Sequence, residues 1–352
     1  RLTFNLIEFS LFLIILFLFL IRFSFFQNKI SKEVTNYLSN EINSDIRLGE
    51  VSLNGFTNLQ LNQIFIPDLN GDTVLFVPKV VVDIQDINWF DRKFEIDQVI
   101  FKNAEIVLRK NPGKKKYEIE FLLNRFEKNQ RESNVYQLLI SEFKIENSQF
   151  YHLSKNSIEE SKNIDIQNFK LFNLNLLLNN TSLDNNLFFS KISNLKFQHE
   201  KGFNISSVNA DLYLDSTKLN LVNFKLKTSN STFNADNINL NLDFKNDFIL
   251  FKNMETQLSI IDYNLFFNRQ LDTTLKLNFN THFSGSSSSI KLKDLSLNYQ
   301  SSSLDGDFEI QDFSNENLVS YFFNLESNSI LVNDLISLQE NINLKIPPLA
   351  LK

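Results

Sequence analysis

The feature that most constrains this chain is an alternation of apolar and polar residues with a period of two. It is cleanest from Ile238 to Phe244, where every second residue is apolar and every partner is polar. Such alternation is typical of a β-strand with one apolar face and one face in water. The pattern recurs over much of the 352-residue chain, for example at 219–221, 275–279 and 290–292. The sequence therefore predicts a mainly β fold.

The predicted sheet has an apolar face that the sequence supplies too few helices to cover. Such a sheet must close on itself, pack as a sandwich, or curl into a groove occupied by something apolar. Roughly 300 residues, at about 12 to 15 for each strand and its turn, give about 20 to 25 strands, more than a single sandwich uses. We therefore expect an elongated, curled antiparallel sheet over residues 47–313, with a few short helices. The predicted groove lining is apolar throughout: Ile238, Leu240, Leu242, Phe244, Leu219, Leu221, Leu275, Leu277 and Phe279.

Local signals add turns and a loose repeat to this sheet. The segment Asp68–Asp72 contains Asn-Gly, a strong hairpin signal. Residues 99–106 and 143–150 share one pattern, which predicts a strand, a polar kink and a second strand, and 224–233 is a weaker third copy. Near the end, Leu318, Val319, Phe322 and Leu325 have helical spacing after the possible cap Ser314. We expect residues 314–352 to hold a helical segment and the start of a further part of the protein.

An almost uninterrupted apolar run lies near the start of the chain, from Phe9 to Ile21, with apolar flanks on both sides. A membrane-spanning helix needs about 20 predominantly apolar residues, which the run and its flanks supply. Signal-peptide cleavage requires small residues just downstream, whereas Arg22 and several bulky rings follow here. We therefore expect residues 1–26 to be an uncleaved transmembrane anchor, rather than a removed signal peptide or a buried soluble helix. Helical spacing of apolar residues predicts a juxtamembrane amphipathic helix over 27–46.

The basic residues around this run bear on which side of the membrane the rest of the chain lies. Arg1 precedes the run, whereas Arg22, Lys29 and Lys32 follow it. Flanking Lys and Arg favour the cytoplasmic side, so the visible count favours a cytoplasmic domain. Residues upstream of Arg1 would change this count, and charge alone leaves the topology open.

The sequence carries no recognisable catalytic or cofactor-binding chemistry. It has no cysteine, which excludes disulfides and thiolate sites, and its net charge of −6 gives no indication of nucleic-acid binding. His152, His199 and His282 are isolated, so we expect no metal site, and Asp68–Asp72 departs from a calcium loop at its glycine and at its last ligand. We therefore predict no enzyme and no cofactor. One basic cluster either solubilises a loop or contacts an anionic headgroup: Arg109, Lys110, Lys114, Lys115 and Lys116.

The order of these features resembles the start of a known family. An anchor and a short helix are followed by the segment 47–56, the turn around Gly71-Asp72-Thr73 and the strand pattern of 96–108. This order is similar to that of the AsmA-like superfamily, including TamB-type envelope proteins and particularly their Bacteroidetes-like versions. The resemblance covers about residues 2–123, is generic beyond them, and returns in 327–336. It does not separate AsmA-type from TamB-type membership.

The resemblance implies an inner-membrane anchor and a periplasmic β-groove of the bridge-like lipid-transfer type. It implies a phospholipid cargo moved towards the outer membrane, and a connection with outer-membrane assembly proteins. Two functional classes stay open: a lipid conduit, and a non-enzymatic structural or interaction protein of the envelope. They differ in whether the apolar face is open along its length or closed by side chains.

Overall fold

The computed structural model describes residues 31–33, 35–36, 39, 44–54, 57–88, 93–110, 137–154, 164–165, 168–184, 187–215, 217–241, 249–266, 276–286, 288–312 and 319–329. Within these ranges the protein is mainly β, as predicted, and its strands form one largely antiparallel sheet of 16 strands. The strand order is β1-β2-β3-β4-β6 and then sequential to β16, with β5 beside β3 and β6. The strands are β1 (Val51–Asn54), β2 (Asn58–Pro67), β3 (Thr73–Asn88), β4 (Lys93–Lys102), β5 (Glu105–Arg109), β6 (Gln137–Leu153), β7 (Asn168–Asp184), β8 (Leu187–His199), β9 (Asn204–Leu214), β10 (Lys218–Thr228), β11 (Thr232–Asn241), β12 (Ile249–Ser259), β13 (Lys276–Gly285), β14 (Ile290–Tyr299), β15 (Ser302–Gln311) and β16 (Ser320–Ser329).

The expected anchor over residues 1–26 lies outside the described residues. In the part of the chain that the structure does describe, no helix combines the length and the apolar character needed to cross a membrane. The described residues between Ser31 and Ser39 are helical, within the range expected for the amphipathic helix. The Ser31 hydroxyl donates to the carbonyl of Gly49 at 2.9 Å. This bond ties the helical residues to the segment that leads into β1.

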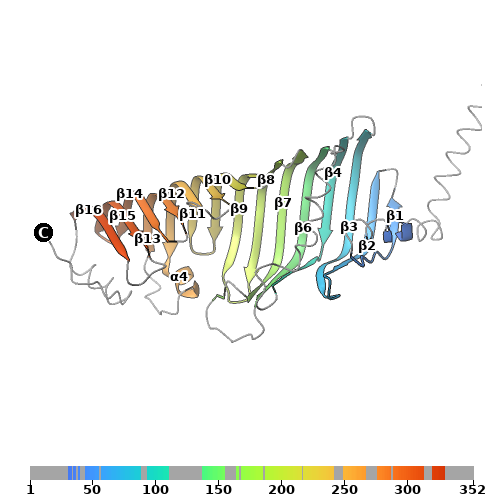
Figure 1. Ribbon diagram of the computed structural model, residues 1–352, viewed down its shortest axis with the longest axis horizontal. Coiled ribbons are helices and arrows are strands. Elements are labelled where there is room, and N and C mark those ends of the chain that lie inside the picture. The colour runs from blue at the N-terminus through green and yellow to red at the C-terminus, as the bar shows by residue number, and fades with distance from the viewer. Residues whose placement is uncertain are drawn as a thin grey trace, which may run out of the picture. The chain divides into compact units, whose positions relative to one another are not determined.

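The chain forms two compact units. Unit 1 comprises Arg1–Ile158 and Gln167–Asn185 and holds β1 to β7. Unit 2 comprises Glu159–Ile166 and Asn186–Lys352 and holds β8 to β16 together with α4 (Ile260–Phe266). Within each unit the strands lie side by side in a single layer (Figure 1).

The predicted hairpin turn joins β2 to β3 in unit 1 and is confirmed. The Asp68 amide donates to the Asp72 carbonyl at 2.8 Å, and the Asp68 carboxylate accepts the amides of Asn70 and Asp72. The side chain of Asp68 is fully buried, so the turn is held by a carboxylate that bonds its own backbone. A buried apolar cluster of the unit lies on β3, on β4 and just after β4, and consists of Val77, Val80, Val99 and Ala104.

The two best copies of the predicted repeat lie next to each other in register. β4 pairs with β6 and β5 pairs with β6 in parallel, so that Val99 is opposite Phe143 and Ile106 is opposite Phe150. The sheet is largely antiparallel, as predicted, but the prediction of antiparallel pairing is wrong for these strands. Period-two alternation carries no information on strand direction, because parallel and antiparallel neighbours alternate in the same way.

The predicted polar kink is a residue in the left-handed backbone region. Asn103 and Asn147 occupy matching places in the two copies and have φ angles of 54° and 47°. The adjacent hydroxyl of Ser148 accepts the amide of Ala104 at 2.8 Å and donates to the carbonyl of Glu146 at 3.0 Å. The kink therefore keeps its backbone groups paired where the regular ladder is interrupted.

Unit 2 repeats this device in an antiparallel arrangement of β8 to β16. Asn223 in β10, Asn253 in β12 and Asp294 in β14 have φ angles of 55°, 50° and 51°. Register shifts accompany these positions in the pairings of β9 with β10, β12 with β13 and β14 with β15. We call the level of the sheet that passes through these three residues the kink row.

One further expectation is corrected, and a second is compared with the described residues alone. Residues 320–329 form β16 rather than a helix. The spacing of this short apolar run suits either structure, and its pairing with β15 selects the strand. The predicted 20 to 25 strands compare with 16 in the described residues. Strands of 16 or 17 residues, such as β3, β6 and β7, use more chain for each strand than the estimate allowed.

Candidate functional site

Most of the predicted groove-lining residues come together on one face of unit 2. Leu219 is opposite Leu240, and Leu221 is opposite Ile238, across β10 and β11. On β13, Leu277 and Phe279 are opposite Leu258 and Thr256 of β12. Directly opposite residues in a pair of strands project to the same side of the sheet. Leu242, Phe244 and Leu275 lie outside the described residues.

The kink row decides which other residues join this face. Before Asn223 the face is formed by Leu219 and Leu221, and after it by Phe224 and Leu226, so the alternation shifts by one at the kink. A left-handed residue inside a strand produces this shift because it re-aims the following side chain. The same shift occurs across Asn253 and Asp294. We call the resulting surface the apolar face; its described members in β10 to β14 are Leu219, Leu221, Phe224, Leu226, Phe233, Ala235, Ile238, Leu240, Ile249, Phe251, Met254, Thr256, Leu258, Leu277, Phe279, Thr281, Phe283, Ile290, Leu292, Leu295, Leu297 and Tyr299.

A row of aromatic rings crosses the apolar face perpendicular to the strands. The centroids of Phe224 and Phe233 are 5.7 Å apart, those of Phe233 and Phe251 are 5.6 Å apart, and those of Phe251 and Phe283 are 5.2 Å apart. Each pair is edge-to-face, an arrangement that stabilises by about 0.5 to 1.5 kcal/mol beyond the buried area. Sequence reasoning missed Phe233, Phe251 and Phe283, because phenylalanine is too abundant in this chain for single rings to stand out.

Nothing that the structure describes covers the apolar face as a second layer. Substantial contacts between the described elements join neighbours in the sheet, and otherwise only α4 with β12. At the level of the kink row, the side chains on the apolar face are buried: Ala235, Met254 and Thr281 are 4 %, 6 % and 4 % exposed. Leu240, Phe251 and most of the remaining apolar residues on this face are only half-buried. The face therefore combines a buried centre with partly exposed apolar side chains around it.

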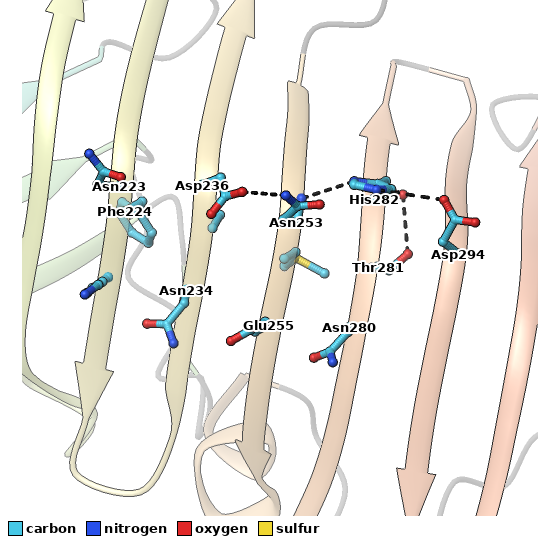
Figure 2. A pocket seen from close by; sticks show the side chains of 13 residues that line it. Asn223, Phe224, Asn234, Asp236, Asn253, Glu255, Asn280, Thr281, His282 and Asp294 are labelled. Carbon is cyan, nitrogen blue, oxygen red and sulfur yellow. Dashed lines mark hydrogen bonds and ion pairs between the residues drawn. The ribbon is translucent and has the colours of Figure 1, made fainter.

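The opposite face of unit 2 is polar and hollowed along the kink row. A cavity of about 540 Å³ is lined there by residues of β10 to β14. Figure 2 shows Asp236, Asn253, His282 and Asp294 in a row across neighbouring strands. The Asn253 side chain donates to Asp236, and the Asn253 backbone N–H donates to His282 Nδ1 at 3.1 Å. His282 Nε2 lies 3.8 Å from Asp294 Oδ2. These contacts join the kink residues on the polar face. Each of the four side chains already has a partner among its neighbours in this row.

Helix α4 borders a second hollow, on the apolar face. This hollow has a volume of about 310 Å³. Asp262 of α4 is 3 % exposed and accepts hydrogen bonds from Thr228 Oγ1 at 2.5 Å, Ser231 Oγ at 2.6 Å and Asn230 Nδ2 at 2.9 Å. A buried carboxylate with three donors is well paired. The three bonds fasten α4 to the turn between β10 and β11.

The predicted basic cluster is only partly described. Arg109 Nη1 lies 3.4 Å from Asp68 Oδ2 and 3.2 Å from Asp72 Oδ2, so its guanidinium holds the β2–β3 turn. Lys110 continues the backbone pairing, its amide donating to the Leu153 carbonyl at 2.8 Å. Lys114, Lys115 and Lys116 lie outside the described residues. Within the described part, Arg109 is occupied by carboxylates, which leaves headgroup contact by this cluster a prediction.

The three histidines lie on different strands, and the described residues hold no group of three or more His, Cys, Asp or Glu side chains placed to bind a metal. His152 and His199 are buried at the ends of β6 and β8. Burial lowers the pKa of His199 below the usual range of histidine, with smaller and opposing effects from Glu200 and Lys201. The Nδ1 atom of His199 accepts the Lys201 amide at 3.0 Å, which suits a neutral imidazole.

Comparison with models of known protein families and with curated protein sequences found no match for this chain.

Proposed function

We propose that the protein is a non-enzymatic lipid-transfer protein that carries phospholipid along the apolar face of its sheet. The observation that supports this most directly is that an apolar face of many side chains is left half-exposed, with no second layer over it among the described residues. Burying one Leu or Phe side chain is worth about 1.5 to 3 kcal/mol. A hydrocarbon chain lying on this face would bury these side chains and gain much of that free energy, whereas contact with water gains none of it.

A hydrocarbon chain suits this face better than a peptide does. The strands already pair their backbone groups with one another, so they have few partners for the N–H and C=O groups of an extended segment laid on top. Leaving such groups unpaired against an apolar surface costs roughly 1 to 3 kcal/mol each. A methylene chain brings no polar groups and so carries no such cost.

The setting of this activity is part of the proposal. The apolar run of residues 1–26 would anchor the protein in the inner membrane, and the resemblance to AsmA-like proteins favours a periplasmic sheet that leads phospholipid towards the outer membrane. In this proposal the sheet is elongated and curled, so that the apolar face forms a groove. The protein would use no cofactor and would work beside outer-membrane assembly proteins.

The test is native mass spectrometry of the full chain purified in mild detergent, with Leu240→Asp as the variant. Leu240 is half-buried, so a carboxylate there can hydrate, and we expect the fold to persist by circular dichroism while bound phospholipid is lost. Asn239→Asp is the matched control, because Asn239 is exposed on the opposite face of the same strand. A folded Leu240→Asp protein that keeps its wild-type phospholipid would refute the proposal. Unfolding of Leu240→Asp alone would indicate a closed core, since an unpaired buried charge is strongly destabilising.

One feature favours the alternative, an interaction protein of the envelope. Among the described strands β16 is the last in the sheet, and Tyr321, Phe322 and Phe323 are 56 %, 55 % and 54 % exposed. Open apolar edge strands are templates for pairing with another chain. Under this alternative the purified protein would carry no phospholipid, and replacing these aromatic residues would weaken binding to an envelope partner without changing lipid content.

A further inference from the structure

The hollow beside α4 differs from the rest of the apolar face because it has an end wall. Its apolar lining consists of seven side chains: Phe203, Phe224, Leu226, Phe233, Ile238, Phe251 and Leu258. At one end stand Thr228, Ser231 and Asp262, which belong to the β10–β11 turn and to α4. Its volume of about 310 Å³ is at the lower end of small-molecule sites, which span roughly 300 to 1,000 Å³.

The end wall is polar in composition but engaged with itself. The Asp262 carboxylate accepts from Thr228 and Ser231, and the Ser231 hydroxyl in turn accepts the Ser259 amide at 3.0 Å. Thr228 Oγ1 also accepts the Ser231 amide at 2.7 Å. These groups satisfy one another, so the wall is rigid and its hydrogen-bonding capacity is used within the protein.

We propose that this hollow binds the methyl-terminal part of a single lipid hydrocarbon chain, with α4 as the stop against which the chain ends. The inference rests on the proposed function and specifies the direction in which a chain lies at this level of the face. The buried carboxylate of Asp262 excludes the opposite orientation, because it would repel the phosphate or carboxylate end of a lipid. A phosphate would also lose its hydration against the seven apolar side chains, and the residues that line the hollow include no Lys or Arg to compensate it. The methyl end of a lipid chain carries no charge, so it loses no ionic hydration when it enters the hollow.

The inference is tested by tryptophan quenching with brominated phosphatidylcholines. The chain has one tryptophan, so Trp89→Phe gives a silent background for the full-length protein in detergent micelles. Phe233→Trp places the reporter in the hollow, and Leu219→Trp places one at the other end of the same face. The lipid carries bromine either near the glycerol or near the methyl end of its chains. We expect the methyl-end label to remove most of the Phe233→Trp fluorescence and the glycerol-end label to remove little.

The outcomes separate the inference from the function on which it depends. If Leu219→Trp is quenched while Phe233→Trp is quenched equally by both labels, or not at all, lipid is bound but the inference is wrong. If neither reporter is quenched and no phospholipid is found by mass, the proposed function itself fails. If circular dichroism shows that Phe233→Trp does not fold, Phe251→Trp probes the same hollow from β12. The same preference for the methyl-end label is then expected, and its absence would overturn the inference.

Discussion

Replacing Ser148 by alanine removes one hydroxyl from the kink between the two parallel copies of the repeat. Ser148 is fully buried, and its Oγ is the acceptor of the Ala104 amide, itself in a residue that is 1 % exposed. The carbonyl of Glu146 loses one donor in the variant but keeps the Asn103 amide at 2.9 Å. The cost is therefore mainly one buried N–H left unpaired, which is about 1 to 3 kcal/mol.

A difference of that size is measurable by amide hydrogen exchange in the full chain. We expect exchange around Asn103 and Gln149 to accelerate roughly 5- to 150-fold, because a free energy of 1 to 3 kcal/mol corresponds to that factor. Ser141→Ala is the matched control, since Ser141 is exposed on the same strand. Unchanged exchange in Ser148→Ala, or an equal acceleration in Ser141→Ala, would show that the hydroxyl does not hold the kink.

Three further outcomes follow from the structure. Asn223→Val should lower the urea midpoint, because a β-branched residue in the left-handed region costs about 1 to 3 kcal/mol, whereas Asn223→Gly should preserve it; equal midpoints would contradict the role of the kink. Burial lowers the folded-state pKa of His199, so folding favours its neutral form. The stability that this contributes is present above the unfolded pKa of about 6.5, and it is lost as the pH falls from there through the folded-state pKa. His199→Gln should flatten the dependence of stability on pH in that window, and an unchanged pH profile would exclude this linkage. Asp68→Ala should destabilise the β2–β3 turn by about 1 to 3 kcal/mol and speed amide exchange at Asn70 and Asp72, whereas intact protection there would mean that the carboxylate is dispensable.

Elements whose physical cause is local were predictable from the sequence. The hairpin at Asp68–Asp72 follows from turn residues that bond their own backbone, and the strands around Ile238 follow from clean alternation. The polar kink was predictable as a position, since two copies of one pattern carry an asparagine at the same place. Six of the nine predicted groove-lining residues share one face for the same reason, and their contact with lipid stays a prediction.

Elements that depend on distant partners were not predictable. The sequence of β16 suits a helix or a strand, and only its pairing with β15 decides between them. The parallel direction of β4 and β6 leaves no trace in either segment. Helix α4 is seven residues long and depends on Asp262 bonding to a turn more than 30 residues earlier, which no local pattern reveals. The row of Phe233, Phe251 and Phe283 depends on the register of three strands at once.

The left-handed kink residues set which face of the sheet each half of a strand's alternation points to. Each strand that carries one consists of two segments of period two whose phases differ by one residue, so a search for a single phase over the whole strand cancels the signal of one half against the other. A deletion of one residue inside either half would turn that half over and expose its apolar side chains. At the kink itself the phase already slips, so this is the place where a single-residue insertion or deletion can be absorbed with the least damage. Length changes among relatives of this chain should therefore gather at the positions equivalent to Asn147, Asn223 and Asn253.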